Sequence, residues 1–273
     1  MKLLSSAKIN LNLKILPMID GNLHGLISDI IPIGIFDEIE ILENNKNIVE
    51  YDKKELNSTH TTVHKAVELI EKVNPSFDKK FNINTAKNIP IEAGLGGSSS
   101  NAGTIIKYLC KEYELNIPPY TEIAQSIGSD VPFFVNGSAA KVEGIGDKIT
   151  ALDGIPNMDL LIAVPQFGFS TKDVFNQYDK MNVIDSPKDL WNQIDIFNDL
   201  FNAVSFIHPE IIDIKNYLES ELNEKFYMSG SGSSLFAIIE DITKHNDLRS
   251  ENFNLESIYI TKKIDCSFSQ NDD

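Results

Sequence analysis

The chain has 273 residues, 42 % of them hydrophobic, which is enough to bury a substantial core in one large domain or two smaller ones. Its 40 acidic residues outnumber its 24 basic residues, and the net charge of −16 disfavours nucleic acid or an anionic membrane as the main partner, because either would repel it. Two cysteines without metal or CxxC spacing indicate reduced thiols, so we expect a cytoplasmic protein without a membrane span.

The first predicted element is a strand over residues 7–15. Apolar side chains alternate there with Lys8, Asn10, Asn12 and Lys14, which is the period of a β-strand. The polar face of this strand has two interpretations: ordinary surface that faces solvent, or the floor of a cleft that holds Lys8 and Asn10.

The next segments alternate between β-structure and helix. Asp20-Gly21-Asn22 indicates a turn before His24, and residues 27–41 are rich in β-forming residues. A helix is predicted over residues 63–73 because its apolar residues share one helical face and Pro75 follows. Residues 81–86 then predict a strand that leads into a glycine-rich stretch.

That stretch, residues 90–102, reads Pro-Ile-Glu-Ala-Gly-Leu-Gly-Gly-Ser-Ser-Ser-Asn-Ala and precedes a predicted helix over residues 102–113. Glycines allow the backbone to approach a ligand, serines supply hydroxyl donors, and a helix N-terminus favours an anion, so the order strand, loop, helix predicts a phosphate site. Neither the lysine of a P-loop nor the third glycine of a Rossmann motif is present. A plain glycine-rich turn between strand and helix is the alternative.

Asp130 lies in the segment Gly128-Ser-Asp-Val-Pro-Phe-Phe, after a short predicted helix over residues 121–127. A carboxylate beside aromatic and aliphatic residues requires a partner, which indicates a nearby cation. The alternative is a helix N-cap, because aspartate often caps a helix that has proline in its first turn.

The remaining chain predicts a second domain. After a hairpin around residues 144–147, the turn cluster Asp153-Gly-Ile-Pro156 indicates a boundary, which gives domains 1–154 and 155–273. A strand over residues 158–164, helices over 171–178 and 211–222, and a mixed helical segment over 190–206 are predicted. A second glycine-serine loop, residues 229–234, precedes a strand over 235–239, and two such loops suggest a shared cleft.

Four segments together resemble the GHMP kinase superfamily and occur in that family's order: residues 6–11, 90–102, 128–134 and 229–233. The Ala-Lys-Ile-Asn-Leu start, His24 and the Ser-Asp-Val-Pro-Phe-Phe motif are most similar to the branch that acts on 4-diphosphocytidyl-2-C-methyl-D-erythritol. The resemblance implies a two-domain α+β fold, with an N-terminal domain like ribosomal protein S5 domain 2 and a C-terminal ferredoxin-like α/β sandwich.

The resemblance also implies an activity: ATP-dependent phosphorylation of that substrate's 2-hydroxyl in the non-mevalonate route to isoprenoid precursors. It makes Asp130 the general base and Lys8 the cation that holds Asp130 ionised. The cofactor-binding residues it implies are Pro90, Gly94, Leu95, Gly96, Gly97, Ser98, Ser99 and Ser100. The substrate-binding residues it implies are Asn10, His24, Phe175, Gly230 and Ser231, with the cytosine held by an aromatic stack on Phe175 and by His24.

Magnesium is expected with ATP, held mainly by phosphate oxygens and water, because no acidic cluster forms a dedicated metal site. Two residues depart from the family pattern: Leu23 replaces an aromatic residue before His24, and Glu92 replaces a small residue in the loop, where we expect its side chain to face water. The alternatives are a kinase for mevalonate, homoserine or a sugar, or a non-catalytic nucleotide-binding protein. The expected oligomeric state is a monomer or a homodimer.

Overall fold

A computed structural model describes residues 1–19, 23–181, 188–245, 248–253 and 255–270. The strands are β1 (Lys2–Asn10), β2 (Asn12–Ile19), β3 (Leu23–Asn44), β4 (Ile48–Tyr51), β5 (Lys80–Ala86), β6 (Ala140–Gly144), β7 (Lys148–Ala151), β8 (Asp159–Pro165), β9 (Asp189–Trp191), β10 (Ile194–Asn198), β11 (Tyr227–Met228), β12 (Leu235–Ile239), β13 (Leu255–Lys262) and β14 (Phe268–Gln270). The helices are α1 (Thr62–Val73), α2 (Gly97–Glu112), α3 (Tyr120–Ser126), α4 (Val131–Asn136), α5 (Thr171–Lys180), α6 (Phe201–Ile207) and α7 (Glu210–Leu222), with short 3₁₀ turns at Lys54–Ser58, Ile242–His245 and Ser250–Phe253.

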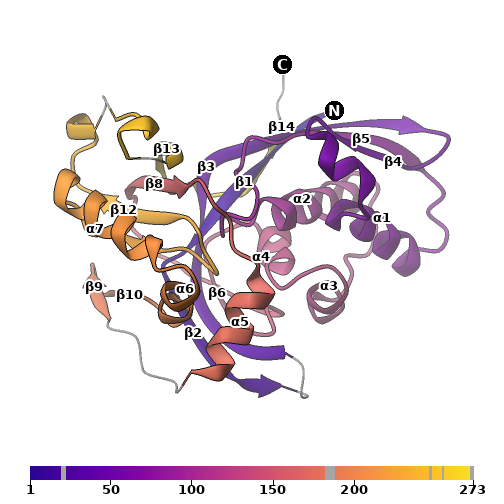
Figure 1. Ribbon diagram of the computed structural model, residues 1–273. Coiled ribbons are helices and arrows are strands. Elements are labelled where there is room, and N and C mark those ends of the chain that lie inside the picture. The colour runs from indigo at the N-terminus through magenta and orange to yellow at the C-terminus, as the bar shows by residue number, and fades with distance from the viewer. Residues whose placement is uncertain (20–22, 182–187, 246–247, 254, 271–273) are drawn as a thin grey trace.

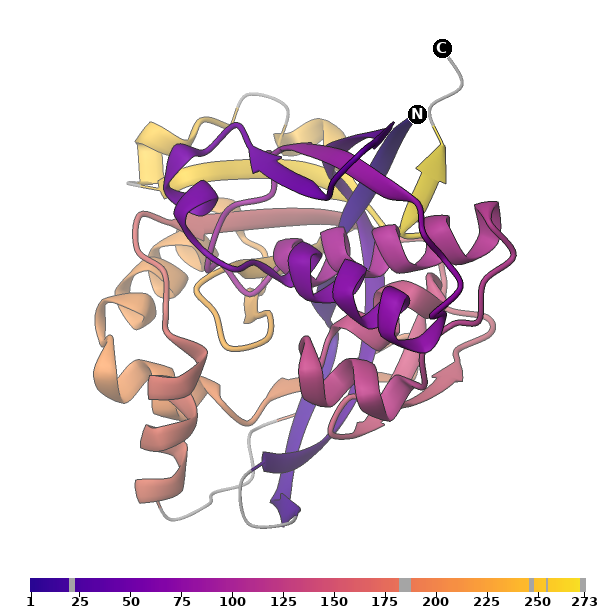
Figure 2. The ribbon, with the colours of Figure 1, turned by 90° about the vertical axis from the view of Figure 1, so that its right-hand side faces the viewer.

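The described strands form a ten-stranded sheet and a four-stranded sheet. The long strand β3 runs through the larger sheet, and helices α1 to α4 lie on one side of it (Figures 1 and 2). The smaller sheet has the order β11-β12-β8-β13. Helices α5 to α7 lie on the face of the smaller sheet that is turned away from the larger sheet (Figure 1). This arrangement confirms the expected α+β class. None of the described helices combines the length and apolar character needed to cross a membrane.

Strand β8 shows how the two sheets meet. Leu160 and Ile162 point into a core shared with β1 and β3 of the larger sheet, whereas Leu161 and Ala163 point into a core shared with α5, α6 and α7. Both faces are therefore covered, which explains why the sequence of this strand is apolar throughout.

The predicted strand over residues 7–15 forms as two strands, β1 and β2, separated at Leu11. Leu11 lies at a bend between them, and its N–H still donates to the carbonyl of Asp29 in β3, 2.8 Å away. The register with β3 changes here, from Asn10 opposite Ile30 to Lys14 opposite Ile27. The alternating polar residues Lys8, Asn10 and Asn12 are only 3 %, 5 % and 6 % exposed. The interpretation as a solvent-facing surface is therefore wrong, because a second layer of chain covers this face of the strand.

The mixed helical segment predicted over residues 190–206 is wrong in its first half. Residues Asp189–Trp191 and Ile194–Asn198 form a β-hairpin, and only Phe201–Ile207 is helical. Asn192 and Gln193 adopt positive φ at the turn, and β10 then pairs in parallel with β2. Pairing with a strand that is distant in the sequence overrides the local pattern here. The predicted helices over 63–73, 102–113, 121–127, 171–178 and 211–222 and the hairpin around 144–147 are confirmed.

The predicted domain boundary lies between β7 and β8, where the chain passes from the larger sheet to the smaller one. Two later segments return to the larger sheet: β10 pairs with β2, and β14 pairs with β1. The division into 1–154 and 155–273 stays a prediction. The turn expected at Asp20-Gly21-Asn22 lies outside the described residues.

A buried ion pair fixes the segment before α2. The ammonium of Lys87 contacts the carboxylate of Asp37, and their side chains are 3 % and 0 % exposed. The other carboxylate oxygen of Asp37 accepts the N–H groups of Asn88 and Ile89, each at 2.8 Å. Asn101 of α2 joins the group, because its side chain accepts from Lys87 at 3.1 Å and donates to Asp37 at 2.9 Å. The glycine-rich loop is thus held at both ends.

Replacement of Lys87 tests this support. We expect Lys87→Met to lower the free energy of unfolding by about 3–5 kcal/mol, because it leaves the carboxylate of Asp37 buried without a cation. Urea denaturation followed by circular dichroism measures the change. The matched control is Lys80→Met, which removes a partly exposed pair with Glu71 (2.7 Å) and should cost about 1 kcal/mol or less. Equal costs for the two variants would contradict the account.

Candidate active site

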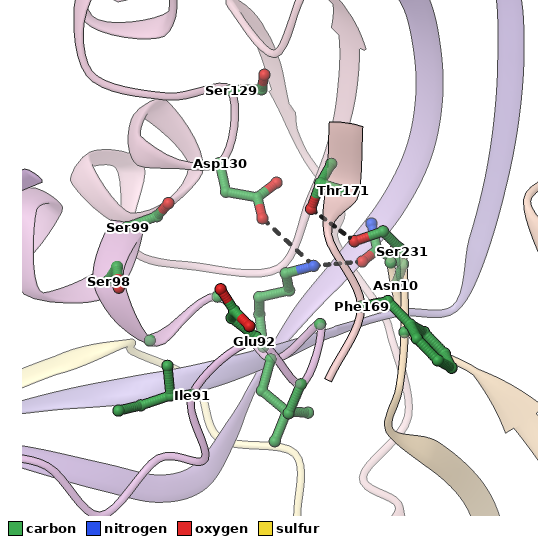
Figure 3. A pocket seen from close by; sticks show the side chains of 18 of the residues that line it. Asn10, Ile91, Glu92, Ser98, Ser99, Ser129, Asp130, Phe169, Thr171 and Ser231 are labelled. Carbon is green, nitrogen blue, oxygen red and sulfur yellow. Dashed lines mark hydrogen bonds and ion pairs between the residues drawn. The ribbon is translucent and has the colours of Figure 1, made fainter. Parts of the chain in front are cut away.

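A cleft of about 630 Å³ lies where the two sheets meet. Its wall includes Lys8 and Asn10 from β1, the loop 90–99, residues 129–130 before α4, residues 169–171 at the start of α5, and the turn 230–232 (Figure 3). Both glycine-serine loops therefore border one cavity, as the sequence suggested. The volume is in the range that holds a small-molecule ligand.

Lys8 is the buried cation of the cleft. Its side chain is 3 % exposed, and its ammonium lies 3.4 Å from a carboxylate oxygen of Asp130 and donates to the side-chain oxygen of Asn10 at 2.5 Å. In Figure 3 the two partners lie on either side of this ammonium. The amide of Asn10 donates in turn to the hydroxyl of Ser28 at 2.7 Å, which fixes the orientation of Asn10.

Asp130 directly precedes α4, but its side chain makes no capping hydrogen bond. The N-cap interpretation of this residue is therefore wrong with respect to the side chain. The carboxylate points into the cleft instead and is 33 % exposed, so it is open to a ligand while it contacts Lys8. A carboxylate beside a buried ammonium is an arrangement suited to accepting a proton from a bound hydroxyl.

The glycine-rich loop leads into α2, whose N-terminus opens on the cleft. Gly96 has a φ of 73° and provides no side chain to cap the helix, so the first N–H groups of α2 are left for a ligand. Pro90, Gly94, Leu95, Gly96, Gly97, Ser98 and Ser99 all line the cleft. Ser100, also predicted to bind the cofactor, does not line the cleft. Its side chain is 0 % exposed and its hydroxyl lies inside the protein, because this position of α2 faces the core.

The two glycine-serine loops pack directly on each other at Gly94. A Cβ at Gly94 would lie 2.3 Å from the carbonyl oxygen of Ser229, so no other residue fits there without a shift of backbone. The hydroxyl of Ser229 donates to the carbonyl of Gly94 at 3.2 Å, and the N–H of Ser234 donates to the carbonyl of Ala93 at 3.0 Å.

Glu92 is exposed, as expected, but it also lines the cleft. Its φ of 55° is unusual for a residue with a side chain, and Figure 3 shows its carboxylate on the cleft side of the loop. The expectation that Glu92 faces water is confirmed, and its side chain also borders the cleft. The backbone turn required by the loop directs this side chain, whatever its charge.

The structure brings Phe175 to the cleft wall and places His24 beside it, outside the residues that line the cavity. The two rings stack with centroids 5.6 Å apart, which leaves no space for a base between them. The ring nitrogens of His24 lie 2.9 Å from the carbonyl of Leu16 and 2.7 Å from the carboxylate of Asp179. Leu23, at the position of the missing aromatic residue, is 49 % exposed.

Sequence reasoning missed several residues at the cleft, among them the polar residues Lys87, Ser129 and Thr171. Lys87 reaches it from below the loop, and Ser129 and Thr171 line its rim. Thr171 shares a hydrogen bond with Ser231 at 2.9 Å, which joins α5 to the second loop. Only the position of Ser129 beside Asp130 gave a signal in the sequence. Within the described residues no group of three acidic, histidine or cysteine side chains could hold a metal ion.

Known proteins are similar to this chain in sequence and in fold. A family model for the N-terminal domain of GHMP kinases matches residues 61–138. The 4-diphosphocytidyl-2-C-methyl-D-erythritol kinase of Clostridium botulinum (strain Langeland) is 32 % identical over 94 % of this chain and 98 % of its own length. The kinase of the same name from Sulfurihydrogenibium sp. is 34 % identical over 86 % of this chain and 90 % of its own length.

Among solved structures, a crystal structure of 4-(cytidine 5'-diphospho)-2C-methyl-D-erythritol kinase superposes with a TM-score of 0.78. It is 22 % identical and covers 96 % of this chain and 99 % of its own, so it supports the fold. The fold, the order of the motifs and the relatives matched over nearly the whole chain agree: this chain belongs to the 4-diphosphocytidyl-2-C-methyl-D-erythritol kinase family of the GHMP kinases.

Proposed function

We propose that the chain transfers the γ-phosphoryl group of ATP to the 2-hydroxyl of 4-diphosphocytidyl-2-C-methyl-D-erythritol. The observation that carries this proposal is the pair of Lys8 and Asp130 in a cleft that also contains an uncapped helix N-terminus. The pair supplies a base and a cation, and the helix supplies an anion site. A protein that only bound a nucleotide would have no need for the pair.

The reaction places one demand on each member of the pair. The substrate oxygen attacks the γ-phosphorus, the bond from that phosphorus to the β,γ-bridging oxygen breaks, and the hydroxyl proton passes to Asp130. The Lys8 ammonium lies beside the Asp130 carboxylate and stabilises negative charge on the oxygen and the transferring group. Asn10 holds the ammonium from its other side, so that Lys8 stays within reach of both.

ATP binding is assigned to the glycine-rich loop. The N–H groups at the start of α2, the helix dipole and the hydroxyls of Ser98 and Ser99 form a site for the triphosphate without a P-loop lysine. Local donors are needed because the net charge of the protein is −16 and its overall field repels a polyanion.

Magnesium fits this site as an ion carried by the triphosphate. The donor set of the cleft contains the carboxylates of Asp130 and Glu92 and the hydroxyls of Ser98 and Ser99, all oxygen ligands of the kind magnesium prefers. Phosphate oxygens and water would complete its coordination, and the ion would neutralise charge between the β- and γ-phosphates. Glu92, which would otherwise repel ATP, is then a carboxylate that such an ion can offset.

The cytidine end of the substrate is assigned to Phe175. This ring lines the cleft, so its open face can stack on cytosine. His24 lies against Phe175 with both ring nitrogens engaged, so in this arrangement it supports the ring from behind. A direct contact of His24 with the base would require its nitrogen to leave Asp179. Gly230 and Ser231 border the reacting groups from the second loop.

A substrate panel tests the assignment. With ATP and magnesium, ADP release should be fast with 4-diphosphocytidyl-2-C-methyl-D-erythritol and at least about 100-fold slower with mevalonate or homoserine, because neither fills the nucleotide pocket at Phe175. A coupled assay for ADP measures the rates. Turnover of mevalonate or homoserine alone would reject the assignment.

Replacement of the base tests the mechanism. We expect Asp130→Asn to lower kcat by about 10²–10⁴-fold, because the amide cannot accept the hydroxyl proton. ATP affinity should change little, and titration with a fluorescent ATP analogue measures it. The control is Asp265→Asn, whose carboxylate is 96 % exposed and which should retain normal kcat. A near-normal rate for Asp130→Asn would remove Asp130 from the role of base.

A further inference from the structure

Asn198 is a buried amide beneath the second glycine-serine loop. It ends strand β10 and is 6 % exposed. Its side-chain N–H₂ group donates to the carbonyls of Met228 and Gly230, each at 2.8 Å. Its side-chain oxygen accepts the N–H of Leu200 at 2.9 Å, which fixes the orientation of the amide. None of the motifs in the sequence includes this residue.

The loop that Asn198 holds contacts the proposed catalytic residues. A Cβ at Gly230 would lie 3.1 Å from the Lys8 ammonium and 3.4 Å from the side-chain oxygen of Asn10. The backbone N–H of Asn10 donates to the hydroxyl of Ser229 at 3.3 Å. The backbone at Gly230 therefore passes directly beside the cation of the cleft, and its orientation determines which group faces that cation.

The hydrogen bond from Asn198 to the carbonyl of Gly230 also sets the direction of the next N–H group, that of Ser231. In a trans peptide the C=O and the following N–H point in opposite directions, so the hydrogen bond from Asn198 to the carbonyl of Gly230 directs the N–H of Ser231 away from the protein interior. Ser231 lines the cleft, and its N–H has no hydrogen-bond acceptor in the described part of the chain. Figure 3 shows Ser231 near the centre of the cleft, beside Asn10.

The opposite orientation of the Gly230–Ser231 peptide would be unfavourable for phosphoryl transfer. If this peptide turned over, the Gly230 carbonyl would face the region of the Lys8 ammonium and could accept one of its three protons. That carbonyl would compete with Asp130 for Lys8, and the cleft would gain an acceptor where negative charge develops. A buried donor that engages the carbonyl prevents both effects.

We propose that Asn198 is a positioning residue for phosphoryl transfer, which orients the Gly230–Ser231 peptide so that its N–H faces the transferring group and its carbonyl stays away from Lys8. The proposal rests on the kinase function proposed above. Asn198 itself contacts neither substrate nor reacting atoms. It acts through the peptide and is therefore expected to affect kcat more than the binding of ATP.

The test is Asn198→Asp, a change of nearly equal size that places a carboxylate oxygen against the two carbonyls in place of two N–H donors. We expect kcat to fall at least tenfold, toward the about 10²–10³-fold cost of losing one preorganised donor at a developing charge. The dissociation constant for a fluorescent ATP analogue should stay within about threefold, because the first loop is unchanged. The variant Asn198→Ser keeps one hydroxyl donor, so its kcat should lie between that of the wild type and that of Asn198→Asp.

Asn74 provides a matched control in a place remote from the cleft. It is 7 % exposed, its N–H₂ group donates to the carbonyls of Ile70 and Asn116 at 3.0 Å each, and its oxygen accepts the N–H of Asn116 at 2.9 Å. Asn74→Asp breaks the same set of bonds, so it should lower the thermal midpoint as Asn198→Asp does but leave kcat within about twofold at a temperature where both variants are folded.

The outcomes separate the two proposals. A normal kcat for folded Asn198→Asp or Asn198→Ser, or an equal loss of kcat in Asn74→Asp, would overturn the positioning role. If the wild-type chain does not phosphorylate the cytidine substrate, the function assignment fails instead. The same variants are then compared in the slow hydrolysis of ATP by water, where Asn198→Asp should again show the greater loss. Equal hydrolysis by wild type and Asn198→Asp would overturn the positioning role independently.

Discussion

The contact between the carbonyl of Ser229 and the bare backbone of Gly94 is the constraint on which the cleft depends. It joins a loop that precedes α2 of the larger sheet to a loop that precedes β12 of the smaller sheet, with no side chain between them. Because the backbones touch, the anion site at α2 and the peptide at Gly230 are set at one fixed separation. Lys8 lies between them, and its own N–H donates to the carbonyl of Leu95 in the first loop.

Buried polar groups then turn this frame into a reactive site. Three segments come together around Lys8: Asn10 restrains the ammonium, Asp130 faces it from the start of α4, and Asn198 holds the loop beside it. A separate ion pair, Lys87 with Asp37, supports the first loop from below. Buried charges are tolerated at both places because each has a partner of opposite sign and further hydrogen bonds.

Local sequence signals predicted the elements that lead into the site. They failed where pairing with a strand distant in the sequence determines the secondary structure. The glycine-rich loop, the helices on either side of it and the position of Asp130 follow from glycine, proline and apolar periodicity. Residues 189–198 were predicted as part of a mixed helical segment but form a hairpin. The local pattern failed there because β10 gains its stability from pairing with the distant strand β2. Ser100 was placed in the anion site, but one further step around α2 turns its side chain into the core. His24 was expected to hold the cytosine together with Phe175, yet its ring stacks on Phe175 and lies outside the residues that line the cleft.

The sequence by itself determined the family, the α+β class and the two residues of the Lys8–Asp130 ion pair, because these depend on residue type and on order along the chain. Only the tertiary structure decided which polar face is buried, where Glu92 points and which peptide Asn198 holds. Strands β1 and β2 lie within the first 19 residues, whereas β10 is Ile194–Asn198, and these strands meet only when the larger sheet forms. Contacts of that kind leave no periodic or compositional signal in the sequence, since the partners are distant along the chain, 32 positions apart for Asn198 and Gly230 and 122 for Lys8 and Asp130.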